Sequence, residues 1–224
     1  MRPVDYRKFR LKYRNTPEFS HVKLLLFWPI FGLFFAFVER VGVSNVYTPI
    51  HIPLDDHIPF CEWFVIPYLF WFVFLIGMLV YTFFFEVPAF RKMMRFVICT
   101  YSVTMAIYIL FPNCQNLRPT AFPRDNILTR FMAWFYTFDT NTNVCPSLHV
   151  IGAVASLYAG WKSRRFGTRP WRIVFVVITV LISLSTVFLK QHSALDVFAA
   201  LPLCALGWWV AEARIPKKKF AQAR

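Results

Sequence analysis

Long apolar runs separated by basic turns constrain this chain more than any other feature of its sequence. Of its 224 residues, 58% are hydrophobic and 20% are aromatic, whereas only 16% are charged. A transmembrane helix needs about 20 predominantly apolar residues, so a chain of this length accommodates about six spans with short connections. We therefore expect an all-α, polytopic membrane protein in which residues 1–224 form one domain without internal repeats.

The apolar runs also place the expected spans. They cover six ranges: 22–38, 63–85, 96–111, 146–161, 173–189 and 194–211. Prolines between residues 39 and 62 predict a loop without helix, and the basic run at 91–95 separates the second span from the third. The aromatic stretch 127–138 is too short to cross a membrane, so we expect it to lie in the interface.

The lysines and arginines indicate how the spans are oriented. Of these 25 residues, 20 lie in the segments 1–23, 86–95, 162–172 and 212–224, and five lie in the remaining connections. The positive-inside rule therefore predicts that both termini are cytoplasmic and that residues 1–21 form a basic cytoplasmic segment, as an interfacial helix or a solvated tail. A net charge of +14 distributed in this way indicates anionic lipid, and not nucleic acid, as the partner.

Residues 185–196, S-T-V-F-L-K-Q-H-S-A-L-D, place ionisable side chains between two apolar runs. Such residues at a membrane boundary are costly and are candidates for function. His192 and Asp196 are four positions apart, the spacing that puts two side chains on one helical face. A carboxylate there can accept from one imidazole nitrogen and leave the other free to react. A polar cluster that only caps two helices is the alternative.

Residues 143–150, N-V-C-P-S-L-H-V, precede another apolar run. Pro146 fits the first turn of a helix, where its missing N–H costs nothing. Ser147 and the free N–H groups of that turn would form an anion site. From His149 the chain crosses inward, turns at the basic loop and returns to His192, so both histidines are expected at the outer membrane face.

Two histidines, one carboxylate and several cations at one membrane face suit phosphoryl transfer. Cations hold and neutralise a phosphate while one histidine attacks phosphorus and the other protonates the leaving oxygen. The expected cations are Arg118 and Arg124, in the polar connection 112–145, and Lys190, beside His192. GxGxxG, P-loop and paired CxxC motifs are absent from the sequence. We expect neither a metal nor a cofactor.

The loop 39–62 and the five cysteines leave other interpretations open. Two His/Asp pairs could bind a metal, although solvated loop residues are the favoured interpretation: His51/Asp55 and Asp56/His57. The cysteines show no metal-ligand spacing, and a disulfide between Cys114 and Cys145 is allowed but not required.

The sequence around His192 resembles the third motif of the type 2 phosphatidic acid phosphatase superfamily, which comprises integral membrane lipid phosphatases and phosphotransferases with six membrane helices. That motif is S-R-x5-H-x3-D. Ser185, His192 and Asp196 match it in register, and Thr186 stands where the arginine belongs.

Two further motifs of the family are present in altered form. The P-S-G-H motif is similar to residues 146–149, P-S-L-H, and the K-x6-R-P motif keeps Arg118 and Pro119 but has Phe111 in place of the lysine. The P-S-L-H and S-T-x4-Q-H variants look like the branch that includes inositol-phosphorylceramide synthases. That branch transfers a phospho-headgroup to an alcohol instead of to water.

The resemblance implies a role for each matching residue. His192 would be the nucleophile that forms a phosphohistidine, with Asp196 orienting it, and His149 would be the general acid. Arg118, Ser147 and Ser185 would belong to the phosphate site. We expect Lys190 and Arg124 to replace the two missing cations, an inference that does not come from the family.

Three functions remain under consideration. The leading hypothesis is a metal-independent lipid phosphate phosphatase in the cell membrane that acts on a membrane lipid at the extracytoplasmic face. A headgroup phosphotransferase that uses the same residues is the closest alternative, and a small transporter with a His192/Asp196 proton relay is the alternative of another class. The lipid and the oligomeric state are left open.

Overall fold

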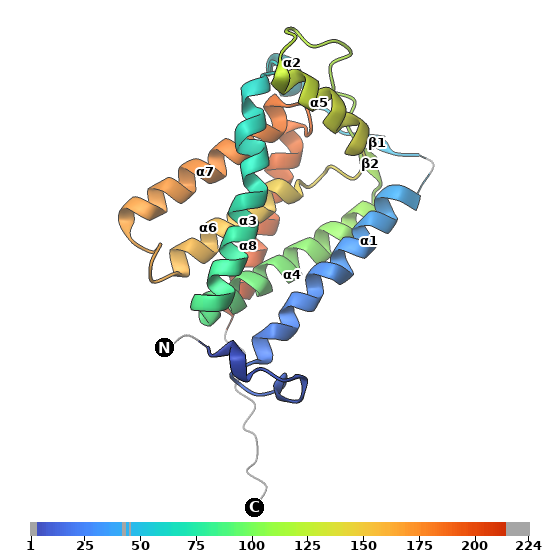
Figure 1. Ribbon diagram of the computed structural model, residues 1–224. Helices are drawn as coiled ribbons and strands as arrows, with labels where there is room; N and C mark the ends of the chain where they lie inside the picture. The colour runs from blue at the N-terminus through green and yellow to red at the C-terminus, as the bar shows by residue number, and fades with distance from the viewer. Residues whose placement is uncertain (1–3, 42–43, 45, 214–224) are drawn as a thin grey trace, which may run out of the picture.

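Helices make up most of the chain (Figure 1). The computed structural model describes residues 4–41, 44 and 46–213. The α-helices are α1 (Phe27–Val41), α2 (Pro53–His57), α3 (Val65–Phe85), α4 (Val87–Leu110), α5 (Ile127–Phe138), α6 (Leu148–Lys162), α7 (Arg169–Phe188) and α8 (Ala194–Glu212). Short 3-10 helices are η1 (Tyr6–Lys8), η2 (Leu11–Tyr13), η3 (Ser20–Leu26) and η4 (Glu62–Phe64). Strands β1 (Thr48–Pro49) and β2 (Asn113–Cys114) pair in parallel.

Five helical stretches in the described part of the chain are long and apolar enough to cross a membrane. They are Ser20–Val41, Glu62–Phe85, Val87–Leu110, Arg169–Phe188 and Ala194–Glu212. The all-α membrane class expected from composition is therefore confirmed. Helix α6 is not among the five because it has only 15 residues, which span about 22 Å at about 1.5 Å per residue.

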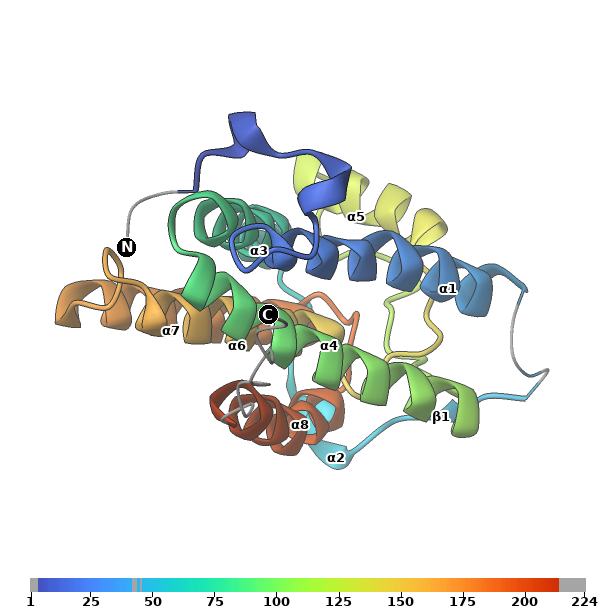
Figure 2. The same ribbon diagram turned by 90° about the horizontal axis from the view of Figure 1, so that it is seen from below.

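Helix α6 lies at the centre of the bundle, in contact with α3, α4, α7 and α8 (Figure 2). Its buried residues include Gly152, Ala153, Ala155, Ala159 and Gly160. Small residues let neighbouring backbones approach closely, which is how helices pack where lipid replaces water. Helix α1 is peripheral by contrast, and Val38 is its one buried residue.

Basic residues from two separate segments, Lys92 and Lys162, meet at one end of the bundle. Glu212, at the end of α8, bonds to Lys92 Nζ at 2.7 Å and to Lys162 Nζ at 2.5 Å. The expected start of the third span at residue 96 is wrong, since α4 already begins at Val87 and contains the basic run. Helix α3 ends at Phe85, and Pro88 lies in the first turn of α4, where proline is compatible with a helix.

The N-terminal segment is folded onto this end of the bundle. Tyr6 Oη donates to the Phe83 carbonyl at 2.6 Å and bonds to His21 Nε2 at 2.7 Å. Arg91 on α4 donates to Ser20 Oγ at 2.9 Å. Tyr6, Phe19 and His21 are thus packed against the bundle, whereas most side chains between residues 7 and 18 are exposed. Residues 1–3 of the basic segment and the tail lysines 217–219 lie outside the described residues.

The opposite end contains α2, α5 and the paired strands (Figure 1). The expectation of a helix-free loop over 39–62 is wrong at two places. Helix α1 continues through Glu39 to Val41, and residues 53–57 form α2. Pro53 occupies the first turn of α2, and the Asp55 carboxylate accepts from the Ile52 N–H at 2.9 Å, so this proline starts a helix.

Close packing of α4 against α8 gives a prediction for Gly207. A Cβ at this position would lie 2.6 Å from Thr100 Cγ2 and 3.0 Å from the Phe96 ring. Gly207→Ala should therefore lower the free energy of unfolding by about 1–3 kcal/mol, the usual cost of overpacking. Unfolding in detergent, followed by circular dichroism, measures this change.

Gly77→Ala on α3 is the matched control, because a Cβ there would meet nothing within 4 Å. Helix propensity predicts that this variant gains up to about 1 kcal/mol. Equal stability changes in the two variants would contradict the close approach of α4 and α8.

Candidate active site

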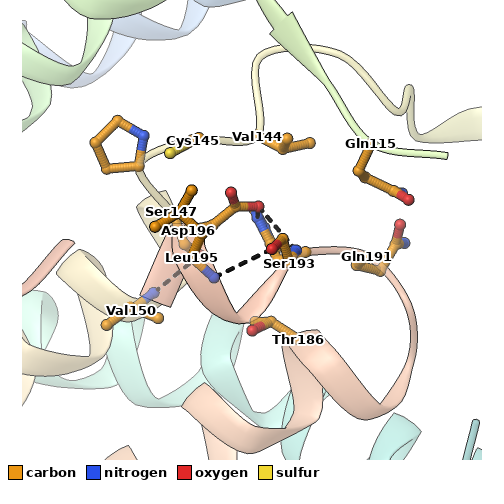
Figure 3. Close-up of polar contacts among 12 residues, drawn as sticks. Gln115, Val144, Cys145, Ser147, Val150, Thr186, Gln191, Ser193, Leu195 and Asp196 are labelled. Carbon is orange, nitrogen blue, oxygen red and sulfur yellow. Dashed lines mark hydrogen bonds and ion pairs between the residues drawn. The ribbon is translucent and has the colours of Figure 1, made fainter. Parts of the chain in front are cut away.

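A tight turn between α7 and α8 presents His192. Lys190 has a φ of 53°, and the N–H groups of Gln191 and His192 both donate to the Thr186 carbonyl at 3.0 Å. Ser193 then caps α8, since its Oγ accepts from the Leu195 N–H at 3.1 Å (Figure 3). The local sequence thus ends one helix, reverses the chain and starts the next within a few residues.

His192 and Asp196 form a hydrogen-bonded pair at this turn. His192 Nδ1 donates to Asp196 Oδ2 at 3.0 Å, and the Ser193 N–H donates to the same oxygen at 3.0 Å. Asp196 is fully buried and His192 is 7% exposed. A carboxylate can only accept, so the neutral imidazole carries its hydrogen on Nδ1 and keeps a lone pair on Nε2. Among the described residues, Nε2 has no hydrogen-bond partner.

His149 lies beside this pair, on the first turn of α6. Its ring is 5.6 Å from the His192 ring, in an edge-to-face arrangement, and it packs against Tyr68 and Trp71 at 4.7 and 4.5 Å between centroids. The Ser147 N–H donates to the Asp196 carbonyl at 3.2 Å, which joins the starts of α6 and α8. The two sequence motifs therefore meet in space.

The structure corrects the expected position of Pro146. Helix α6 begins at Leu148 and Ser147 is its cap, with its Oγ accepting from the Val150 N–H at 3.5 Å. Pro146 precedes the helix, and its carbonyl accepts from Tyr108 Oη at 2.7 Å. The N–H groups of Leu148 and His149 have no partner among the described residues.

A cavity of about 310 Å³ opens in front of the two histidines. Most of its wall is aromatic, with rings from α1, α3, α4 and α5: Trp28, Phe31, Phe35, Tyr68, Trp71, Phe72, Tyr101, Tyr108, Phe135 and Phe138. Its polar wall consists of Glu39, Asp139, Thr140, Thr142, Asn143 and Gln191. Within the part of the chain that the structure describes, no lysine or arginine lines this cavity.

Arg118 lies next to the site but is engaged with the backbone. Its two η nitrogens donate to the carbonyls of Tyr136, Asp139 and Thr140 at 2.9–3.0 Å and to Gln191 Oε1 at 2.7 Å. Burial lowers the pKa of Arg118, and the nearby Asp139 charge opposes that shift. Burial raises the pKa of Asp139, which Arg118 in turn opposes. Arg118 therefore does not line the cavity, but it donates a hydrogen bond to Gln191, which directly precedes His192.

The other residues expected to bind phosphate do not line the cavity. Lys190 Nζ donates to the Asp55 carbonyl at 2.8 Å, and burial lowers its pKa against the opposing charges of Asp55 and Asp56. Arg124 is 65% exposed and pairs with Glu62 at 2.9 Å. Ser185 is buried and donates to the carbonyl of Ile182 at 2.6 Å within α7. Sequence proximity placed Lys190 beside His192, but its positive φ turns the side chain elsewhere.

Asp55 is the residue that sequence reasoning assigned wrongly. It was expected in solvent or paired with His51, yet it is 2% exposed, and His51 bonds to Asp56 instead at 2.8 Å. Its carboxylate accepts from Ser193 Oγ at 2.5 Å and from the Ala194 N–H at 2.7 Å. The sequence I-P-L-D, with an acid two residues after a proline, is a helix-start signal that could have indicated burial.

Glu39 is a second residue without a predicted role. It lies on the last turns of α1 and accepts from Thr140 and from Asn143 Nδ2, the latter at 2.7 Å. The sequence predicts a loop at Glu39, whereas this residue belongs to α1, and this is why no role is predicted for it. Cys114 and Cys145 are free thiols.

Comparisons of this chain with protein families, with curated proteins and with solved structures found no match.

The contacts of Arg118 predict a strong dependence on its planar guanidinium. Arg118→Lys leaves one ammonium group where four directed hydrogen bonds existed, so the free energy of unfolding should fall by about 1.5–3 kcal/mol. Denaturant titration in detergent measures this loss.

Arg124→Lys is the matched control in the same connection. Arg124 is 65% exposed, and a lysine in its place can still pair with the buried Glu62 carboxylate, so the loss should be at most about 1 kcal/mol. Similar losses in both variants would show that the Arg118 contacts add nothing beyond surface charge.

Proposed function

We propose that this chain is a metal-independent lipid phosphate phosphatase, related to the type 2 phosphatidic acid phosphatases, that works through a phosphohistidine. The observation that carries the proposal is the buried Asp196 carboxylate on Nδ1 of His192, which leaves Nε2 unpaired beside the second histidine, His149. This site supports the proposed reaction class, and the membrane helices and the aromatic cavity support the proposed substrate class.

The proposed first step transfers the phosphoryl group to the protein. The Nε2 lone pair of His192 attacks phosphorus, an N–P bond forms, and the bond from phosphorus to the lipid oxygen breaks. His149, protonated next to the phosphate anion, gives its proton to that oxygen. Asp196 stabilises the positive charge that develops on the His192 ring and keeps its tautomer fixed.

The second step returns the enzyme to its starting state. Water gives a proton to His149 and attacks phosphorus, the N–P bond breaks, and inorganic phosphate leaves. His149 therefore acts as acid in the first step and as base in the second. His149 is the side chain that exchanges protons in this scheme: it gives one to the lipid oxygen and takes one from water.

Helix α6 offers the anion site that the scheme requires. The N–H groups of Leu148 and His149 are unpaired among the described residues, and the positive end of the helix dipole points to the same place. Ser147 shapes this helix start as its cap. The positive charge of Arg118, which bonds to Gln191, adds to the positive potential at this site.

The arrangement of the bundle supports an extracytoplasmic site in a multi-pass membrane protein. The histidines lie at the opposite end from the Glu212 cluster with its lysines, and basic segments are normally cytoplasmic. Helix α6 then makes the sixth crossing, and both termini are cytoplasmic. The lipid bilayer and a lipid phosphate are the proposed partners; neither a cofactor nor nucleic acid is involved.

A headgroup phosphotransferase is the second candidate, and the polar wall of the cavity favours it. Glu39, Asp139 and Asn143 present carboxylate and amide oxygens, which accept hydrogen bonds from hydroxyl groups. With a lipid phosphodiester as donor, His192 would carry the phospho-headgroup, and an alcohol held at the polar wall would replace water in the second step and take that group, so that a new phosphodiester forms. The same two histidines would serve both reactions.

Rapid quenching during turnover tests the covalent step. Purified protein is mixed with a lipid phosphate in the presence of a chelator, and an acid-labile, base-stable phosphate should be trapped on His192. His192→Ala should abolish the adduct, and His149→Ala should slow turnover by about 10²-fold or more, the usual scale of general acid catalysis. Phosphate release and peptide mass spectrometry provide the two measurements.

His57→Ala is the control, because His57 is an exposed histidine of α2 outside the cavity. It should retain the turnover and the adduct of the unmodified protein. Full turnover by His192→Ala would exclude the phosphohistidine, and activity that disappears with chelator would exclude the metal-independent scheme.

The fate of the phosphoryl group distinguishes hydrolysis from transfer. With a lipid phosphodiester donor and a panel of alcohols, a transferase should produce a new phosphodiester, whereas a hydrolase should produce the same products with or without alcohol. If transfer occurs, Glu39→Gln should reduce it because the amide accepts hydroxyl hydrogens less strongly than a carboxylate. Glu18→Gln, an exposed change at the other end of the bundle, is the control.

A further inference from the structure

The start of α8 is occupied by a carboxylate from a distant part of the chain. Asp55 belongs to α2, 138 residues before Ser193, yet its Oδ2 accepts from Ser193 Oγ at 2.5 Å and its Oδ1 accepts from the Ala194 N–H at 2.7 Å. The 2.5 Å distance is typical of a charge-assisted hydroxyl–carboxylate bond. A buried carboxylate is costly unless its oxygens are paired, and these partners pair both of them.

Asp55 is itself held in place by its surroundings. The Ile52 N–H donates to its Oδ2 at 2.9 Å, which fixes the carboxylate relative to α2. Lys190 Nζ donates to its backbone carbonyl at 2.8 Å, which ties α2 to the turn that carries His192. The acid is therefore a rigid support and not a mobile loop side chain.

Ser193 connects this support to the histidine pair. Its N–H donates to the same Asp196 oxygen that accepts from His192 Nδ1, and it follows His192 directly in the chain. Fixing the Ser193 hydroxyl and the Ala194 N–H therefore fixes the backbone from which both His192 and Asp196 extend. Hydrogen bonds therefore connect Asp55 to Ser193, Ser193 to Asp196, and Asp196 to His192.

The same contacts explain why only one helix start remains open at the site. Asp55 fills the anion position at the start of α8, whereas the N–H groups of Leu148 and His149 at the start of α6 are unpaired among the described residues. Both helix starts favour negative charge. The Asp55 carboxylate occupies the start of α8, and the start of α6 remains available for the phosphate of the proposed substrate.

We propose that Asp55 is a positioning residue, which sets the geometry of the His192–Asp196 pair through Ser193. This inference rests on the proposed function. It requires that loss of the Asp55 charge slow the chemical step while lipid binding is preserved, since Asp55 does not line the cavity. A cap with a purely structural role would change stability without that kinetic signature.

Asp55→Asn is the test, with the neighbouring Asp56→Asn as its matched control because Asp56 is exposed. Asp55→Asn should lower kcat by about ten- to a hundredfold, the scale expected when a reacting group is displaced by up to about 1 Å, with KM nearly unchanged. Amide hydrogen exchange over residues 189–196 should become faster in Asp55→Asn only. The exchange measurement needs no substrate, so it does not depend on the proposed function.

Ser193→Ala provides a second route if Asp55→Asn does not fold. It removes the hydroxyl contact but keeps Asp55 on the Ala194 N–H, so kcat should fall by a smaller factor, again without a change in KM. In the double variant, Asp55→Asn with Ser193→Ala, the two effects should be less than multiplicative because the residues act as one unit.

The possible outcomes distinguish failure of the positioning role from failure of the proposed function. Faster exchange with an unchanged kcat, or a rise in KM alone, would overturn the positioning role while leaving the phosphohistidine scheme intact. Unchanged exchange and kcat in Asp55→Asn would do the same. An unmodified protein that forms no adduct with any lipid phosphate would instead refute the proposed function, and the exchange result would then report on the Asp55 contact alone.

Discussion

The Asp196 carboxylate at the start of α8 is the interaction on which the rest of the site depends. One of its oxygens accepts from His192 Nδ1 and from the Ser193 N–H, and its backbone carbonyl accepts from the Ser147 N–H. A single residue thereby fixes a histidine tautomer, caps its own helix and joins α6 to α8. Asp196 is fully buried, and the two donors on Oδ2 replace water at that oxygen, whereas Oδ1 has no hydrogen-bond partner among the described residues.

The cavity in front of the two histidines is lined by two carboxylates and, among the described residues, by no lysine or arginine. The two η nitrogens of Arg118 donate four hydrogen bonds, to three backbone carbonyls and to Gln191. Glu39 and Asp139, in contrast, line the cavity. The positive potential at the cavity therefore comes mainly from the start of α6 and from Arg118, which is separated from the cavity by Gln191. Such a field favours a small anion at one place and hydroxyl groups on the opposite wall.

The sequence predicted what depends on local spacing. The four-residue interval between His192 and Asp196 gave their hydrogen bond, and the two motifs that carry His149 and His192 do meet. The aromatic stretch 127–138 is the helix α5. Five of the six expected spans correspond to long apolar helices, because hydropathy is a property of consecutive residues.

What depends on long-range pairing was not predictable in this way. Asp55 and Ser193 are 138 residues apart, so a pattern of nearby residues gives no reason to bury that acid. Lys190 was expected in the site from its distance along the chain, but the backbone at φ 53° directs it to α2. The predicted helix boundaries near Glu39 and Val87 are wrong because charged residues and prolines do not end these helices: α1 continues to Val41, and α4 begins at Val87 with Pro88 in its first turn.

The shortness of α6 has a consequence for the fate of a reaction intermediate. Its 15 residues reach about 22 Å, whereas the hydrocarbon layer is about 30 Å thick. In the proposed orientation the Lys162 end of α6, which pairs with Glu212, would lie at one membrane boundary, and the other end would stop several ångströms short of the opposite surface. A phosphohistidine formed there would be shielded from bulk solvent. The lifetime of this intermediate would then depend on how fast an acceptor reaches that depth. Whether water or an alcohol arrives first would decide between hydrolysis and transfer.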